Sequence, residues 1–174
     1  KFLCLNSGSE SVGLAARIAD INSKLMTDPD GRHAGRIIKR IVVKGSLHGR
    51  TERPALYSDS SRKSYQQHLA SYRGEDSVIA IPPYDVDALK QAFADAETKG
   101  WFVEAVFLEP VMGEGDPGRS LPRAFYDAAR ERTQAHGALL LVDSIQAGLR
   151  AHGVLSIVDY PGFEGIDPPD METY

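Results

Sequence analysis

The chain has 174 residues, of which 42% are hydrophobic and 25% are charged, and its formal net charge is −4. This composition is typical of a globular domain with a sizeable core, and it excludes intrinsic disorder. The acidic balance argues against a nucleic-acid binder, and no apolar run approaches the roughly 20 residues that a membrane helix needs. No secretory-signal pattern is present, so we expect a protein that is not secreted. The single cysteine, Cys4, excludes a disulfide framework and, because it lies in an apolar run, is expected in the core.

Four apolar runs of strand length predict the sheet of an α/β fold. They are Ile38–Lys44, Val78–Ile81, Val103–Glu109 and Ala138–Asp143. Val103–Leu108 and Ala138–Val142 are nearly continuous apolar runs, which is typical of parallel strands that are covered on both faces. Helical patterns alternate with them, which indicates a mostly parallel sheet flanked by helices.

The helical patterns have recognisable start and stop signals. Ser7 and Glu10 fit a capping box at the start of the first helix. Asp85 can cap a second helix, and Pro122 begins a third that ends at His136–Gly137. The segment Tyr57–Glu75 is polar and weakly patterned, which predicts a long excursion from the sheet. The apolar residues of the first helix recur at helical spacing: Leu14, Ile18, Ile21 and Leu25.

Both ends of the sequence are abrupt. Phe2–Leu5 is an apolar, strand-like run at the very start of the chain. Asp167–Tyr174 is a proline-rich acidic segment, which predicts a turn. From this pattern we expect that the chain is a piece of a longer protein.

Polar and glycine-rich segments follow four of the apolar runs. They span residues 6–10, 44–51, 109–115 and 143–148. The carboxyl ends of parallel strands meet at one edge of a sheet, and ligands of such sheets bind beyond that edge. We therefore expect the four segments to lie together and to form one site.

Several residues in these segments could bind a ligand, and each also has an ordinary structural explanation. Ser7–Ser9, at a helix start, offers amide groups, two hydroxyls and the positive end of a dipole to a phosphate, although it could be a simple N-cap. Asp143 ends an apolar strand and needs a partner, since an unpaired buried charge costs several kcal/mol. A cationic ring nitrogen would serve, with Gln146 near a ring substituent; the alternative is an aspartate that caps the next turn. For Glu109 and Glu114 the alternative is turn chemistry.

The sequence lacks the motifs of several other classes of protein. The five histidines show no metal-ligand spacing, so we expect no metal site. Neither a GxSxG elbow nor a GxxxxGK[ST] loop is present, which argues against a serine hydrolase and a P-loop NTPase.

The four segments, in this order, resemble the class III aminotransferases, the group of ornithine, acetylornithine, 4-aminobutyrate and other ω-amino-acid aminotransferases. The matching stretches are residues 6–10, 45–51, 109–115 and 136–146. The resemblance implies an aspartate-aminotransferase-like fold (pyridoxal-phosphate fold type I). It also implies that residues 1–174 are the central part of the cofactor-binding large domain. The amino-terminal segment, the Schiff-base lysine region and the carboxy-terminal small domain would then lie outside the chain.

The same resemblance implies residue roles. Gly8 and Ser9 would hold the phosphate of pyridoxal 5′-phosphate, and Asp143 would keep its ring nitrogen protonated. Gln146 would lie near the phenolic oxygen of the ring, and Glu114 would line the substrate pocket, where it can neutralise an arginine. The implied cofactor-binding set is Gly8, Ser9, Leu47, His48, Asp143 and Gln146, and the implied substrate-binding pair is Glu109 and Glu114.

Three positions depart from the family pattern. Leu47 stands where the family usually has Phe or Tyr over the cofactor ring, and it offers apolar cover without an aromatic face. Ser144 and Ala147 stand where the family usually has Glu and Thr. The Schiff-base lysine is expected beyond Tyr174, because the last lysine of this chain is Lys99.

The expected activity of the complete protein is amino-group transfer from an amino acid or ω-amine to a 2-oxo acid, by a homodimer in the cytoplasm or the mitochondrial matrix. The chain alone is expected to be inactive, because it lacks the lysine. A non-catalytic subunit of the same fold is the alternative, favoured by Leu47 and Ser144 and opposed by the survival of Asp143 and Gln146. Racemisation or decarboxylation with the same cofactor is a third possibility.

Overall fold

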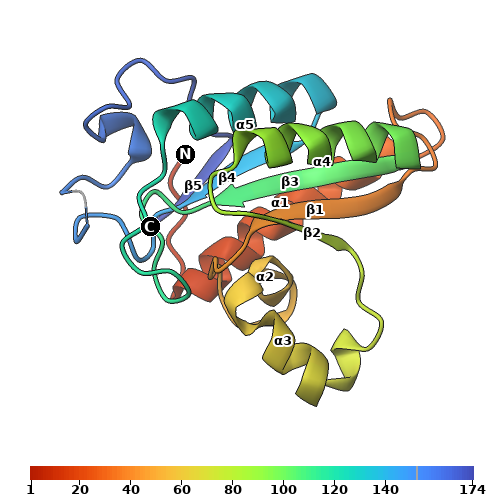
Figure 1. Cartoon of the computed structure of the whole chain (residues 1–174), viewed down its shortest axis with the longest axis horizontal. Helices are drawn as coiled ribbons and strands as arrows, with labels where there is room; N and C mark the ends of the chain where they lie inside the picture. The colour runs from red at the N-terminus through yellow and green to blue at the C-terminus, as the bar shows by residue number, and fades with distance from the viewer. Residues whose placement is uncertain (152) are drawn as a thin grey trace.

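The computed structural model describes residues 1–151 and 153–174. Its centre is a sheet in which every neighbouring pair of strands is parallel, with the order β2-β1-β3-β4-β5 (Figure 1). The predicted α/β fold with a mostly parallel sheet is therefore confirmed. The strands are β1 (Ile37–Val43), β2 (Val78–Ile81), β3 (Trp101–Leu108), β4 (Leu139–Asp143) and β5 (Met171–Thr173).

Helices cover both faces of the sheet. On one face, α4 (Val86–Lys99) and α5 (Arg123–His136) pack against β3, and on the other face α1 (Gly8–Thr27) packs against β3 and α2 (Glu52–Tyr57) (Figure 1). Side chains of β3 alternate between the two layers, because successive residues of a strand point to opposite faces. Leu108 belongs to the cluster under α4 and α5, whereas Phe107 belongs to the cluster under α1.

The predicted helix start and stop signals are confirmed. The Ser7 hydroxyl accepts a hydrogen bond from the Glu10 amide at 3.2 Å, and Asp85 caps α4 by accepting from the Ala88 amide at 2.9 Å. Gly100 and Gly137 end α4 and α5 with positive φ angles of 68° and 80°, a conformation that favours glycine.

The prediction that Phe2–Leu5 is a strand is wrong, and so is the burial of Cys4. This segment has no strand pairing, and Cys4 is exposed. Apolar residues become a strand only where a neighbouring strand completes the hydrogen bonds of their backbone. Here the segment runs beside α1 and β5 instead, where Phe2, Leu3 and Leu5 line a hollow together with residues 170–174.

Two polar segments are more ordered than predicted. The turn predicted for Asp167–Tyr174 contains β5, whose Asp143↔Thr173 register continues the sheet beyond β4. The excursion predicted for Tyr57–Glu75 contains α3 (Asp59–His68) and a 3₁₀ turn, Ala70–Tyr72. Neither element could be recognised from apolar periodicity, because α3 buries no residue and β5 has only three.

Helix α1 presents its small residues to the sheet. Its buried apolar positions are Val12, Ala15, Ala16 and Ala19. The larger Ile18, Ile21 and Leu25 are 41%, 58% and 69% exposed. The apolar spacing therefore predicted the helix correctly. The face that packs on the sheet, however, is the one with small side chains, which allow the helix backbone to approach the sheet closely.

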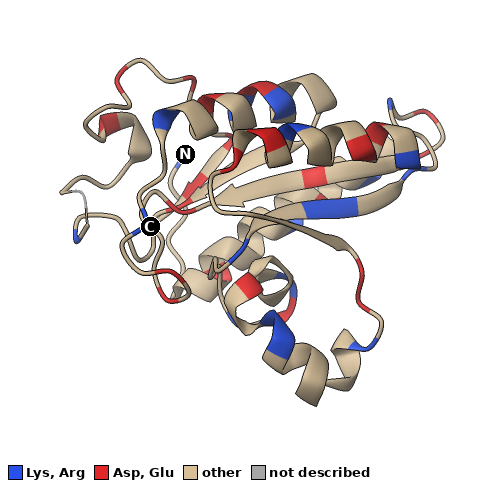
Figure 2. Cartoon of the chain, viewed as in Figure 1, with Lys and Arg blue, Asp and Glu red and all other residues tan. Residues whose placement is uncertain are grey.

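A buried carboxylate ties the α1 face of the sheet together. Glu104, in the middle of β3, is fully buried and accepts hydrogen bonds from Arg40 of β1 at 2.8 Å and from Arg53 of α2 at 3.0 Å. Figure 2 shows basic (blue) colour within β1 and acidic (red) colour within β3. The Ser23 hydroxyl of α1 donates at 3.2 Å, and the Tyr57 hydroxyl donates as well. The network joins α1, β1, α2 and β3, and the loop after β1 connects two of these elements, β1 and α2.

At the opposite end of the sheet, His136 is held as a neutral imidazole. Its Nε2 accepts a hydrogen bond from the Val103 amide at 3.0 Å, so its proton lies on Nδ1, which is 2.9 Å from a carboxylate oxygen of Glu97. Burial, with the neighbouring His33, lowers the pKa of His136 to about 4, although Glu97 opposes the shift.

This geometry predicts that the stability of the fold decreases as the pH is lowered. Unfolded histidine binds its proton near pH 6.5, so between pH 6.5 and 4 the unfolded state binds more protons than the folded state. The stabilisation is complete above pH 6.5, and about 2 kcal/mol of it should be lost between pH 7 and pH 5. Denaturant unfolding at the two pH values checks this. His136→Gln should flatten the dependence, whereas the control His68→Gln, at an exposed site, should not; equal slopes for all three proteins would contradict the assignment.

Within the described part of the chain, none of the helices has the length and apolarity required to cross a membrane.

Candidate active site

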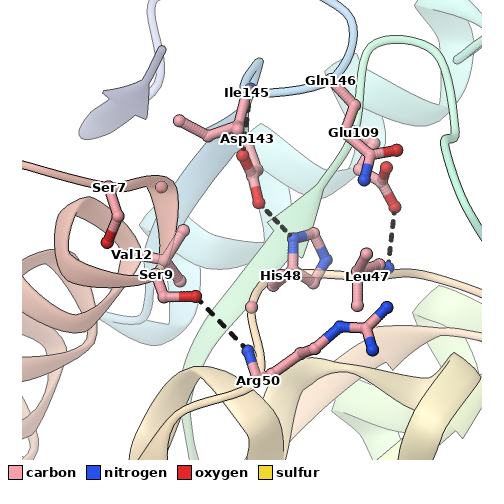
Figure 3. A pocket seen from close by; sticks show the side chains of 12 residues that line it. Ser7, Ser9, Val12, Leu47, His48, Arg50, Glu109, Asp143, Ile145 and Gln146 are labelled. Carbon is pink, nitrogen blue, oxygen red and sulfur yellow. Dashed lines mark hydrogen bonds and ion pairs between the residues drawn. The ribbon is translucent and has the colours of Figure 1, made fainter.

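A pocket of about 280 Å³ lies at the carboxyl edge of the sheet, beside the start of α1 (Figure 3). The prediction that Ser9 and Asp143 share one site is confirmed, because both line this pocket. Seven of the eight predicted site residues line it, and the eighth, Glu114, lies at its rim. The lining residues are Ser7, Gly8, Ser9, Val12, Leu47, His48, Gly49, Arg50, Glu109, Asp143, Ile145 and Gln146.

One end of the pocket is the amino terminus of α1. The first amides of a helix have no partner within it, and the helix dipole makes this end positive. The loop after β1 closes tightly on it: the Arg50 amide donates to the Ser9 hydroxyl at 3.4 Å, and Gly49 has a φ of 111°. A Cβ at Gly49 would lie 2.9 Å from the Ser9 hydroxyl oxygen, and one at Gly8 would lie 2.9 Å from the Ile145 side chain. Both glycines permit this close approach.

The other end of the pocket is the carboxylate of Asp143, which is 4% exposed. Its Oδ2 accepts a hydrogen bond from Nδ1 of His48 at 2.9 Å. Its Oδ1 accepts from the Ile145 amide at 3.2 Å and from the Thr173 hydroxyl at 3.0 Å. Three donors from three segments therefore fix the carboxylate where it faces the pocket.

His48 is locked beside Asp143. Its amide donates to the Ser58 hydroxyl at 2.9 Å, and the edge of its ring packs against Phe107 with centroids 5.6 Å apart. Burial alone would lower the pKa of His48, but the hydrogen bond and the charge of Asp143, helped by Glu109, raise it above its usual value. Its buried Nε2 has no hydrogen-bond partner among the described residues.

Glu109 clamps two loops of the pocket. One carboxylate oxygen accepts from the Leu47 amide at 3.0 Å and the other accepts from the Gly113 amide at 2.9 Å. Burial raises the pKa of Glu109, while His48 and the two amides act against the shift. Because both oxygens already bind backbone amides, the structure gives this residue a part in shaping the pocket wall; contact with a substrate stays a prediction.

The remaining predicted residues lie on the open side. The Gln146 side chain covers Gly113, where an added Cβ would lie 1.5 Å from the side-chain amide oxygen, so a larger residue at position 113 would require Gln146 to move. Leu47 is half-buried and lines the pocket, as apolar cover would require. Glu114 is exposed, and its two carboxylate oxygens lie 2.6 and 2.8 Å from one guanidinium nitrogen of Arg50, Nη2.

Two residues escaped prediction from the sequence. Arg50 lines the pocket and is bound by Glu114; its place in the same motif as His48 was the available signal. Thr173 reaches Asp143 from β5, and no sequence pattern indicated that strand.

One departure from the family pattern has a structural counterpart on β5. Ser144 stands where the family usually has glutamate, and its hydroxyl donates to Glu172 at 2.9 Å. The same carboxylate accepts from the Ser156 hydroxyl at 2.7 Å and the Ile157 amide at 2.8 Å. A carboxylate thus still lies beside position 144, supplied by the neighbouring strand.

Comparison with known proteins decides the family. The profile of the family described as "Aminotransferase class-III" matches residues 1–173. The chain belongs to the class III aminotransferases. It is 34% identical to the acetylornithine aminotransferase of Mycolicibacterium smegmatis in an alignment of 174 positions that covers 99% of this chain and 37% of that relative. The chain therefore spans about a third of the length of such a relative.

Solved structures of class III aminotransferases share this fold. The N-acetylornithine aminotransferase of Stenotrophomonas maltophilia K279a is 28% identical, with a TM-score of 0.62 over 98% of this chain and 35% of that chain. The ornithine aminotransferase of Toxoplasma gondii ME49 is 26% identical, with a TM-score of 0.69 over 94% and 35%. The predicted fold type I is thus confirmed. Another structure of the Toxoplasma enzyme is described with partial occupancy of pyridoxal phosphate at its active site, and this is the cofactor that the family indicates.

The residues of the pocket fit this cofactor. The positive helix end with the hydroxyls of Ser7 and Ser9 suits a phosphate. The buried carboxylate of Asp143 suits a protonated ring nitrogen, and the unpartnered Nε2 of His48 leaves polar capacity beside it. No group of three or more metal-ligating side chains occurs in the described part of the chain.

Proposed function

We propose that this chain is the cofactor-binding part of an aminotransferase that transfers an amino group between an amino acid or ω-amine and a 2-oxo acid. The observation that carries the proposal is the pocket itself. It places a phosphate-binding helix end and a fixed, buried carboxylate at its two ends, with Leu47 and Gln146 between them on the lining.

The residues of the chain would act by binding and by fixing charge. The first turn of α1, with Gly8 and Ser9, would hold the phosphate. Asp143 would accept a hydrogen bond from the protonated ring nitrogen, and His48 would hold Asp143 in place by donating from Nδ1. Bound pyridoxal phosphate supplies an electron sink for the amino-acid carbanion, and a protonated ring nitrogen deepens that sink.

The rim of the pocket supports substrates that carry a carboxylate. Arg50 is the one Lys or Arg among the described residues that line the pocket, and its side chain is 62% exposed although Glu114 binds it. A guanidinium suits bidentate binding of a carboxylate. We therefore propose an amino donor that carries a carboxylate, as ornithine, N-acetylornithine and 4-aminobutyrate do, with Glu114 balancing the charge of Arg50 when no such donor is bound.

We further propose that the complete protein supplies what the pocket needs from outside this chain. No lysine occurs among the described residues that line the pocket. The Schiff-base lysine would then come from the region beyond Tyr174, and the small domain and a second subunit of a homodimer would close the pocket. Residues 1–174 are, on this proposal, the central part of the large domain.

The test uses the whole protein encoded by the gene that contains this chain. Purified with pyridoxal phosphate, it should transfer the amino group of at least one of N-acetylornithine, ornithine and 4-aminobutyrate to a 2-oxo acid. Borohydride reduction followed by peptide mapping should place the cofactor on a lysine outside residues 1–174. An adduct on one of the seven lysines of this chain would contradict the lysine assignment.

The non-catalytic alternative makes a different prediction for the same protein. A scaffold subunit would bind pyridoxal phosphate weakly or not at all and would transfer no amino group from any donor. The Glu172 carboxylate beside Ser144 speaks for a maintained site, because it keeps the Asp143 turn anchored at the position where the sequence departs from the family.

A further inference from the structure

The end of β5 has a part in the pocket that neither the sequence motifs nor the family assignment gives it. Thr173 lies directly opposite Asp143 in the parallel register of β4 and β5. Residues paired across neighbouring strands share one face of the sheet, so both side chains point the same way. The Thr173 hydroxyl lies 3.0 Å from Oδ1 of Asp143, and Thr173 is only 7% exposed.

The direction of this hydrogen bond is fixed by chemistry. An ionised carboxylate only accepts hydrogen bonds, so the Thr173 hydroxyl is the donor. The backbone holds the hydroxyl in place as well, because the Thr173 carbonyl accepts from the Ser144 amide at 2.8 Å. Threonine is also restricted at χ1 by its branched Cβ. The donor is therefore presented to Asp143 with little freedom to turn away.

We propose that Thr173 is a positioning residue that orients the Asp143 carboxylate toward the ring nitrogen of the cofactor; this rests on the proposed function of the pocket. Thr173 and the Ile145 amide together satisfy Oδ1, and His48 binds Oδ2. With Oδ1 fully engaged, the remaining acceptor capacity of Oδ2 is the part of the carboxylate left to a ligand. Thr173 acts only through Asp143 and touches no substrate.

Glu172, the residue before Thr173 in β5, makes contacts on the other face of the sheet. Successive residues of a strand point to opposite faces, and Glu172 binds Ser144, Ser156 and Ile157 on the face away from Asp143. β5 therefore supports the end of β4 from both faces, but only Thr173 contacts the carboxylate of Asp143.

The test compares two probes that differ at one ring atom. Pyridoxamine 5′-phosphate binds without a Schiff base, and its 1-deaza analogue replaces the ring nitrogen by a C–H group. Their affinities for the whole protein are measured by calorimetry. Thr173→Val should weaken binding of pyridoxamine 5′-phosphate about threefold to tenfold, as expected for a lost hydrogen bond, and should leave the affinity for the deaza analogue within about twofold. Thr173→Ser should restore the original affinity.

The controls separate positioning from folding. Thr133→Val removes a hydroxyl from another buried threonine, which bonds only within α5, and should leave both affinities unchanged. Thr173→Ala is a second variant without the hydroxyl, should the valine variant fail to fold. Equal weakening of both probes by Thr173→Val, or weakening of neither, would overturn the positioning role. If the unaltered protein binds neither probe, the proposed function itself fails.

Discussion

Replacing Asp143 by alanine should reduce the amino-transfer rate of the enzyme that carries this chain by at least about 10²-fold while leaving the fold intact. The carboxylate is 4% exposed and is held by three donors, so it is a fixed charge at the end of the pocket. A preorganised charge of this kind contributes several kcal/mol to transition-state stabilisation. Steady-state kinetics with saturating cofactor measure the effect.

Two further variants accompany this prediction. One removes only the charge at position 143, and the other removes an aspartate from a different part of the chain. Asp143→Asn keeps the shape of the side chain but loses its charge, and it should be impaired almost as strongly as the alanine variant. Asp30→Ala removes an exposed aspartate near the far end of α1 and should leave the rate unchanged. Near-normal turnover of Asp143→Ala would show that this carboxylate has no part in the chemistry.

Glu104→Ala should lower the free energy of unfolding by about 3–5 kcal/mol, the usual effect of removing one partner from a buried ion pair. The variant leaves the buried guanidinium of Arg40 without the carboxylate that it binds at 2.8 Å. It also removes the acceptor of Arg53 and of the Tyr57 hydroxyl. Denaturant unfolding of the chain measures the loss.

A surface carboxylate supplies the control for this second prediction. Glu131 is exposed and lies 3.6 Å from Arg132, so Glu131→Ala should change the stability by less than about 0.5 kcal/mol. Glu104→Gln should fall between the two variants, because it keeps a hydrogen-bond acceptor for one arginine. A loss below about 1 kcal/mol for Glu104→Ala would mean that the network contributes little.

The parts of the fold that could be predicted are those with a local signal. β2 and the strands that end at Leu108 and Asp143 show apolar runs, and α4 and α5 carry caps and terminal glycines. Elements without such signals were missed. The strand β5 is three residues long and is fixed by pairing with β4, a contact between residues 30 positions apart that no local pattern encodes.

The residues of the site also fall into those that could be predicted from the sequence and those that could not. His48 and Asp143 follow strands of the parallel sheet, which brings such positions to one edge, so their meeting could be predicted. Ser9 reaches the same pocket from the first turn of α1, because the run before it, Phe2–Leu5, is not a strand. The partners of the site residues could not be predicted, because Thr173 reaches Asp143 through strand register and Arg50 meets Glu114 across two loops. Cys4 was misplaced for a related reason: apolar neighbours predict burial only where a second element covers them.

The protonation state of the ring nitrogen tests the central claim most directly. Pyridoxamine 5′-phosphate labelled with ¹⁵N in the ring reports, by its nitrogen chemical shift, whether that atom carries a proton. Bound to the unaltered protein at a pH at which the free compound has lost this proton, the nitrogen should remain protonated, and with Asp143→Ala it should not. A bound nitrogen without its proton, or the same spectrum with both proteins, would contradict the assignment of Asp143 and of the pocket.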